Sequence, residues 1–212
     1  GHAIAAIPTA IAAARRDDAS ALENALQAMQ TALSNMMTTF ERMPEGCNPK
    51  VYYQRVRPYM FGFDDVVYRG AFNDQPQSYR GETGAQSTVI PALVRLLGIQ
   101  HADSGLMEHL RIMQDYMPKP HRDFLHGIDD QAVRNYVLAN RQKGSLCDTY
   151  NATLLRLLDF RKMHLRFAMA YIINQAAQAN AESSEKAATG TGGTPFAQWL
   201  RQLIDETQRQ LA

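Results

Sequence analysis

Large apolar residues recur every three or four positions along most of the chain, which is the spacing of one face of an α-helix. The clearest stripe runs from Leu22 to Phe40, and shorter stripes follow over 104–117 and 129–140. The longest stripe begins at Ser145, and a last one covers 196–203. Because these stripes do not alternate with strand-like runs in a βαβ order, the pattern predicts an all-α fold.

Start signals and glycine-rich stretches set the expected limits of the helices. Ser20 and Glu23 form a capping box at the start of the first long stripe. Asn48–Pro49 begins another helix, because asparagine caps a helix and proline suits its first turn. Segment 61–85 is rich in glycine and is the least helical part, with a short extended piece expected at 66–68.

The helix that begins at Ser145 carries two apolar faces and is therefore expected to be a long central helix that is packed on all sides. Arg161 and His164 share the first face, one turn apart. The first face also comprises Leu146, Tyr150, Leu154, Leu157, Ala168 and Tyr171, and the second comprises Leu155, Leu158, Leu165, Met169 and Ile172.

Composition narrows the class of protein. Hydrophobic residues make up 45% and charged residues 20% of the 212 positions, which fits one globular domain over residues 1–212. The net charge of +1 provides no basic excess for a phosphate backbone, so we expect no nucleic-acid partner. The longest clean apolar run, 167–173, is far shorter than the ~20 residues of a membrane helix, so we expect no membrane span. Cys47 and Cys147 form no disulfide framework, which favours a cytoplasmic location.

His164 is the strongest candidate for chemistry. Its position leaves two roles open, either a core histidine that is bonded to a neighbouring carbonyl group or an axial ligand of haem iron. A neutral imidazole in an apolar wall suits iron, and the cation of Arg161 one turn earlier suits a haem propionate. His101 and the remaining histidines lack the spacing of a zinc site, which leaves them packing or surface roles.

Two glycine-rich segments are further candidates. Segment 81–87 leads into a helix, and its amides and hydroxyls are suited to bind an anion such as a carboxylate. Segment 190–194 ends a longer stretch, 181–194, which lacks large apolar residues and is predicted to be a flexible loop. The simple alternative for both is a connector. For the second, the functional alternative is a lid whose glycine backbone approaches a ligand closely.

A set of short motifs occurs along the chain in a fixed order. They are Arg57–Gly62, Val67–Gly70, Leu96–Gln100, Tyr116–Pro118, Pro120–Arg122, Phe124–Leu125, Arg161–His164 and Gly190–Thr194. In this order they resemble the indoleamine 2,3-dioxygenases, over essentially the whole chain. By this resemblance we expect the N-terminal small domain of the family to be absent from this sequence. The distal aromatic wall and the arginine that holds the substrate carboxylate are expected to be absent with it.

The resemblance implies a helical oxidoreductase of tryptophan catabolism, in the kynurenine pathway, that contains haem b. Such an enzyme inserts both atoms of O2 across the C2–C3 bond of an indole substrate and converts tryptophan to N-formylkynurenine. The resemblance makes His164 the proximal ligand of the iron and Arg161 the partner of a haem propionate. The chemistry is expected at the haem iron, so no side chain is predicted to be catalytic.

The same resemblance implies roles for the two glycine-rich segments. Gly81 and Thr83 match a loop beside the haem, where Thr83 stands in place of a serine, and Thr83 and Gly84 are expected to face the substrate. Thr191 and Gly192 match a flexible loop that closes over the substrate.

The chain departs from the pattern of the family at two positions. Glu82 adds a charge to the loop beside the haem, and Val94 stands where mammalian members carry an aspartate on the proximal side. Two alternatives accompany tryptophan dioxygenation, the first because of the altered loop at 81–86 and the second because the family's N-terminal part is expected to be absent from this sequence. One is a haem protein of the same superfamily that acts on another indole in secondary metabolism. The other is a non-catalytic helical domain for haem binding or interaction.

Overall fold

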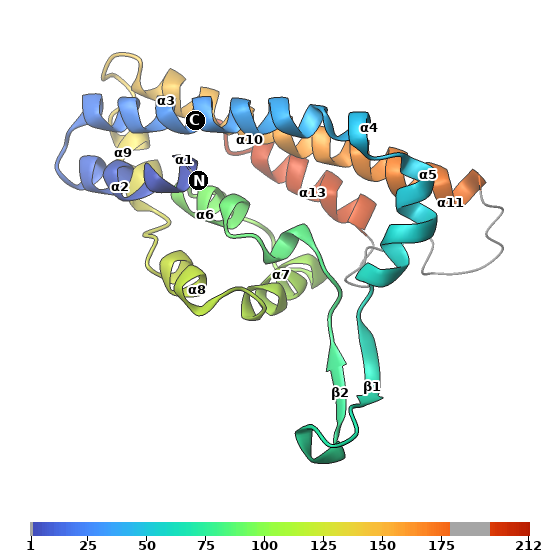
Figure 1. The fold of residues 1–212 in the computed structure, drawn as a ribbon. Coiled ribbons are helices and arrows are strands. Elements are labelled where there is room, and N and C mark those ends of the chain that lie inside the picture. The colour runs from blue at the N-terminus through green and yellow to red at the C-terminus, as the bar shows by residue number, and fades with distance from the viewer. Residues whose placement is uncertain (1, 179–195) are drawn as a thin grey trace. The chain divides into compact units, whose positions relative to one another are not determined.

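The computed structural model of the chain describes residues 2–178 and 196–212, and Figure 1 shows that helices dominate them. This confirms the all-α prediction. Contacts between Cα atoms divide the chain into two compact units. The first unit comprises Gly1–Arg42, Ala85–Met163 and Arg201–Ala212, and the second comprises Met43–Gly84 and His164–Leu200. The expectation of one domain over 1–212 stays a prediction.

Helices of the first unit surround one apolar core. The helices are α1 (His2–Ala5), α2 (Ile7–Arg15), α3 (Ala19–Glu41), α6 (Val89–Leu96), α7 (Gly105–Asp115), α8 (Lys119–His126), α9 (Ala132–Ala139), most of α10 (Leu146–Ala168) and the end of α13 (Phe196–Gln208). Helix α2 packs on α3, α6 and α9. Ala10 and Ala13 of α2 are fully buried, because small side chains allow this close approach of helices.

The two longest helices, α3 and α10, lie side by side in the first unit (Figure 1). The Nε2 atom of Gln30 donates hydrogen bonds to the carbonyl oxygen of Thr149 (3.0 Å) and to Oγ1 of Thr153 (3.1 Å). These bonds join α3 to α10 through polar groups of two buried threonines, whose own hydrogen bond from Thr153 Oγ1 to the carbonyl oxygen of Thr149 (2.9 Å) they supplement. Neither these helices nor any other described helix combines the length and apolar character that a membrane span needs.

The start of α3 differs from the prediction. Asp18 is the capping residue, and its Oδ1 accepts a hydrogen bond from the backbone N–H of Ala21 at 2.9 Å. The preceding Asp17 has a φ of 57°, which turns the chain between α2 and α3. The prediction of a capping box at Ser20 and Glu23 was therefore wrong. Aspartate caps a helix as well as serine does, and Asp18 stands only two residues before Ser20.

Helix α10 begins within one residue of the predicted start, but it is not packed on all sides. Tyr150 and Leu157 on the first face are fully buried. On the second face, Leu155 is 45% exposed. The prediction of a helix surrounded by core was therefore wrong for this part, because apolar character does not reveal which face finds a partner.

Two π-helical segments occur among the described residues of the second unit. Besides the end of α10 and the start of α13, its described helices are α4 (Met43–Gly46), α5 (Pro49–Val51), the π-helix η1 (Tyr52–Val56), the 3₁₀-helix η2 (Arg57–Met60), the π-helix η5 (Met169–Ile173) and α11 (Asn174–Gln178). Asn48 caps α5 as predicted, and its Oδ1 accepts hydrogen bonds from the N–H groups of Lys50 (3.0 Å) and Val51 (3.2 Å). Segments η1 and η5 contact each other through Tyr52 and Tyr171, whose ring centroids are 5.8 Å apart.

Segment 61–85 forms a β-hairpin in the second unit. Strand β1 (Phe63–Val67) pairs antiparallel with β2 (Pro76–Tyr79), and short 3₁₀ turns η3 (Phe72–Asp74) and η4 (Gly84–Gln86) occupy its tip and the segment that follows it. Val66 and Val67 belong to β1, which confirms the expected extended piece for these two residues. The rings of Phe63 and Tyr79 pack edge to face at 5.5 Å between centroids.

The turn after α6 is held between α9 and α10. Gly98 has a φ of +60°, and a Cβ atom there would lie 2.9 Å from Arg134 Cβ and 3.0 Å from the carbonyl oxygen of Asp130. The hydroxyl group of Tyr150 donates to the carbonyl oxygen of Leu97 at 2.5 Å and accepts from Arg134 Nη1 at 3.0 Å. Glycine is therefore required at position 98 both by backbone conformation and by space.

Replacing Gly98 with alanine should destabilise the protein by about 1–3 kcal/mol, because the residue adopts a left-handed conformation and its Cβ overlaps Arg134. Urea unfolding measures the loss. Gly127→Ala is the matched control, since its φ is negative (−78°) and its Cβ meets no atom closer than 3.5 Å. Equal stabilities of the two variants would contradict this account of the turn.

Candidate functional site

His164 lies near the C-terminal end of α10, and its side chain is exposed. The surrounding protein nevertheless desolvates the imidazole enough to lower its pKa below the usual 6.5. The ring is therefore neutral at pH 7, which is the form that coordinates iron. The exposed side chain differs from the close packing expected of a core histidine, and the role of His164 as a ligand stays a prediction.

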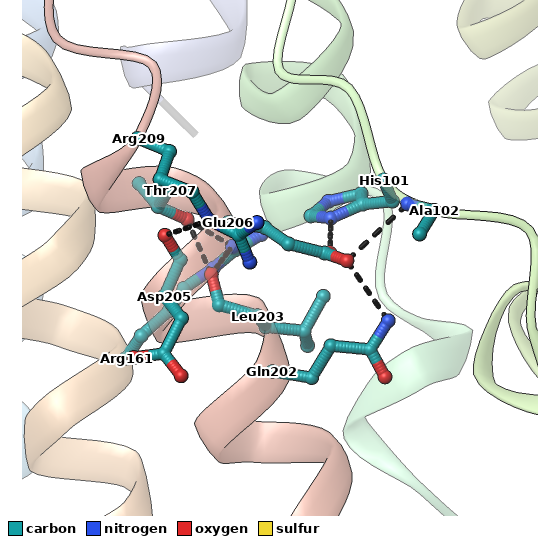
Figure 2. A network of polar contacts seen from close by, with 9 residues as sticks. All are labelled: His101, Ala102, Arg161, Gln202, Leu203, Asp205, Glu206, Thr207 and Arg209. Atoms are coloured by element: carbon teal, nitrogen blue, oxygen red, sulfur yellow. Dashed lines mark hydrogen bonds and ion pairs between the residues drawn. The ribbon is translucent and has the colours of Figure 1, made fainter.

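Arg161 lies one turn earlier on α10 and is only 4% exposed. Its Nη1 donates hydrogen bonds to the carbonyl oxygen of Leu203 at 2.5 Å and to Oγ1 of Thr207, both on α13 (Figure 2). Burial lowers the pKa of Arg161 to about 10, against the opposing effect of Glu206, so the group stays charged at pH 7. Among the described residues, no group accepts a hydrogen bond from its buried Nε.

Glu206 of α13 lies in a second group of hydrogen bonds (Figure 2). Its Oε2 is 2.5 Å from Nδ1 of His101, and the two side chains are 7% and 4% exposed. Its Oε1 accepts hydrogen bonds from the backbone N–H of Ala102 at 3.2 Å and from Nε2 of Gln202 at 2.9 Å. The packing role expected for His101 is thus a buried contact with a carboxylate.

The ionisation of this pair follows from its surroundings. Burial lowers the pKa of His101 more than the hydrogen bond with Glu206 raises it. Burial alone would raise the pKa of Glu206, but hydrogen bonds from Gln202, His101 and Ala102 outweigh it and lower that pKa. At pH 7 a neutral His101 therefore donates its Nδ1–H to an ionised Glu206.

The loop at 81–84 is anchored at its beginning in the second unit. Gly81 is buried, and the backbone N–H of Glu82 donates to the carbonyl oxygen of Met60 at 2.9 Å. Gly62 approaches the same strand end so closely that a Cβ atom would lie 2.3 Å from the carbonyl oxygen of Tyr79. Further along the loop, Thr83 is half-buried and Gly84 is exposed and begins η4.

Arg57 is a buried cation that the sequence placed in a family motif but did not indicate as a site residue. It follows η1 and is 3% exposed. Its guanidinium lies 4.7 Å from the ring centroid of Phe61 and 5.4 Å from that of Tyr53. Burial lowers its pKa. The dense run of aromatic residues on both sides of Arg57 in the sequence is a signal that could have drawn attention to it.

The predicted site residues fall into both units. Arg161 belongs to the first unit, where the structure joins it to α13. His164 and the loop residues Gly81, Thr83 and Gly84 belong to the second unit. Thr191 and Gly192, with the rest of the predicted loop 181–194, lie outside the described residues.

An open apolar groove of about 520 Å³ on the first unit is lined by none of these residues. Its walls come from α2 and α8 and the turn after α8, and they include Ile7, Ile11, Phe124 and Ile128. The groove therefore belongs to the surface of the helical bundle rather than to the predicted site.

Comparison with known proteins defines the class and the family of this helical chain. The family model described as Indoleamine 2,3-dioxygenase matches residues 1–210. The chain is 32% identical to indoleamine 2,3-dioxygenase 1 of Mus musculus and 31% identical to that of Rattus norvegicus, with 99% of this chain aligned in each case. It therefore belongs to the indoleamine 2,3-dioxygenase family, an oxidoreductase family of dioxygenases that act on small indoles.

The relatives also show how much of such a protein this chain represents. The alignments cover 55% of both rodent proteins, so the chain spans about half the length of these curated relatives. A 6-hydroxytryptophan 2,3-dioxygenase of Fusarium equiseti is 30% identical, over 78% of this chain and 46% of its own length. Similarity of the same degree thus extends to relatives named for different substrates.

Acid should destabilise the first unit through His101 and Glu206. Both groups have pKa values below their unfolded values, so the stability they contribute is present at neutral pH and is lost as the pH falls. The loss due to His101 begins near its ordinary pKa of 6.5, and the loss due to Glu206 begins near 4.5. Urea unfolding between about pH 7 and pH 5 should therefore show a falling free energy of unfolding.

The variant His101→Asn keeps an N–H donor for Glu206 but cannot titrate, so its free energy of unfolding should fall less over the same range. His121→Asn, at an exposed position on α8, serves as the control and should keep the wild-type slope. A wild-type slope in the His101 variant would contradict the assigned protonation state.

Proposed function

We propose that this chain is the haem-bearing part of an indoleamine 2,3-dioxygenase that acts on tryptophan or a related indole. The observation that carries the proposal is His164, an exposed and neutral imidazole on α10, in a chain that the family model matches almost from end to end. Haem b bound at His164 would supply the chemistry that inserts O2 into the indole C2–C3 bond.

Two features of the described residues fit a haem. His164 has the charge state and the exposure that an axial ligand needs. Arg161, three residues earlier on the same helix, keeps a buried Nε–H that no described residue accepts. A propionate oxygen would satisfy this donor and would balance the buried charge of the guanidinium.

The other residues of the chain would hold the substrate and exclude water, since the cofactor carries the oxygen chemistry. Gly81 and Thr83 stand beside the cofactor in this proposal, and the hydroxyl of Thr83 and the backbone of Gly84 face the substrate. The anchored start of this loop supports a positioning role, because Gly62 and Met60 limit its movement at that end.

Arg57 is suited to bind the carboxylate of an amino-acid substrate. A buried guanidinium among aromatic rings combines a charge for the carboxylate with flat apolar surfaces for an indole. In this proposal Arg57 takes the role of the substrate-binding arginine that we expected to be absent from the sequence.

A related indole is the second candidate substrate. Glu82 places a carboxylate in the loop beside the proposed cofactor, and a relative of equal similarity is named for 6-hydroxytryptophan. Steady-state turnover of L-tryptophan and of 6-hydroxytryptophan by the full-length protein separates the two. The free thiols of Cys47 and Cys147 accord with the cytoplasm, and that location stays a prediction.

Replacing His164 with glycine in the full-length protein should abolish the haem axial-ligand signature, because no other imidazole is proposed to reach the iron. The measurements are haem content and the ferrous carbon-monoxide spectrum. Free imidazole should restore part of the signature. His126→Gly, which alters an exposed histidine at the end of α8, is the control. Unchanged haem content and spectrum in the His164 variant would refute the assignment.

Replacing Arg57 with glutamine should raise the KM for L-tryptophan by roughly ten- to hundred-fold, because a charge-assisted contact with the carboxylate is lost. The KM for an indole without a carboxylate should change little. Arg55→Gln, at an exposed position two residues earlier, should leave both values near wild type. An equal change for both substrates would show that Arg57 does not bind the carboxylate.

A further inference from the structure

The buried face of α13 is polar. Within this helix Glu206 and Thr207 are 6% and 1% exposed, whereas Leu203 and Ile204 are only half-buried. Buried polar groups cost free energy unless they are hydrogen-bonded, so this face is adapted to specific partners rather than to general apolar packing. The residues that form hydrogen bonds with Glu206 and Thr207 therefore indicate the role of α13.

Thr207 and Arg161 form one of these partnerships. Oγ1 of Thr207 accepts a hydrogen bond from Nη1 of Arg161 and donates to the carbonyl oxygen of Leu203 at 2.6 Å (Figure 2). The same Nη1 also donates to the carbonyl oxygen of Leu203. A guanidinium is a rigid plane, so fixing one nitrogen atom against two acceptors restricts the directions of the other N–H groups.

Glu206 supplies the second anchor. Its carboxylate receives hydrogen bonds from His101 and Ala102, which lie between α6 and α7. Because Glu206 and Thr207 are adjacent residues that bond to different elements, they restrict both rotation and sliding of α13. The acceptors that hold Arg161 are therefore themselves held in place.

We infer that Thr207 and Glu206 are positioning residues that hold the Arg161 guanidinium with its Nε toward an anionic group of the cofactor. This inference rests on the proposed function, in which that group is a haem propionate. Docking of α13 and binding of the cofactor then share one side chain, so each strengthens the other. The end of α13 is in this way part of the cofactor site without touching the cofactor.

The test is the haem dissociation constant of the full-length protein with either of two substitutions at one position. Thr207→Val keeps the shape of the side chain but removes the hydroxyl, and it should weaken haem binding roughly tenfold, the effect of one hydrogen bond to a charged group. Thr207→Ser keeps the hydroxyl and should bind haem within about twofold of wild type.

Thr153→Val is the matched control for a purely structural effect. Thr153 is also fully buried, also donates to the carbonyl oxygen four residues earlier (2.9 Å) and also accepts a hydrogen bond from a side chain, in this case Gln30. Loss of the Thr153 hydroxyl group should lower the free energy of unfolding without raising the haem dissociation constant. An equal loosening of haem by Thr153→Val would overturn the inference.

A double-mutant cycle with Arg161→Lys tests whether Thr207 acts through Arg161. In the Arg161→Lys background, Thr207→Val should cause no further loss of haem affinity. Hydrogen exchange gives a readout apart from affinity, since haem should slow exchange of the α13 amides in wild type and not in Arg161→Lys. A full further loss in the double variant would overturn the inference.

The outcomes separate this inference from the proposed function. If the wild-type protein binds no haem, or binds it equally well after loss of His164, the proposed function fails and the inference falls with it. If wild type binds haem through His164 and Thr207→Val binds it as tightly, only the inference fails.

Discussion

The buried guanidinium of Arg161 is the group on which the arrangement around α10 and α13 depends. A charge with 4% exposure must be hydrogen-bonded, and its acceptors lie on a helix 42 and 46 residues further along the chain. The hydrogen bonds require one rotation and one register of α13, whereas an apolar stripe would tolerate sliding. Arg161 thereby fixes the end of α13 as a specific part of the first unit.

The same helix links this constraint to the proposed cofactor. Helix α10 is continuous from Leu146 to Ala168, and positions three residues apart on a helix are neighbours on its surface. Arg161 and His164 therefore lie one turn apart along the same helix. The roles proposed for these two residues, Arg161 as partner of a propionate and His164 as ligand of the iron, rest on this helical spacing and on the family to which the chain belongs.

The second unit contributes irregular backbone rather than long helices. The π-helical segments η1 and η5 meet through Tyr52 and Tyr171, and π-helical turns occur frequently at functional sites. Arg57 follows the first of these segments and lies among aromatic rings. Close backbone contact at Gly62 anchors the loop that begins at Gly81. The match to the indoleamine 2,3-dioxygenase family covers all of these segments of the second unit.

Much of the fold could be predicted from the sequence because helices are local structures. The stripe from Leu22 to Phe40 predicted α3, and Asn48–Pro49 predicted the start of α5, since the hydrogen bonds that form a helix and its cap join residues within four positions. The placement of Arg161 and His164 on one long helix was predicted for the same reason, whereas their roles at a haem stay a proposal.

The tertiary structure alone decided which faces are buried and which distant side chains meet. His101 and Glu206 are 105 residues apart, and Arg161 and Thr207 are 46 apart, so no local pattern links them. The second face of α10 is as apolar as the first, yet Leu155 is 45% exposed. Whether a face is buried depends on which remote elements pack against it. Whether two side chains bond depends on their distance in space, and the spacing of residues along the chain determines neither.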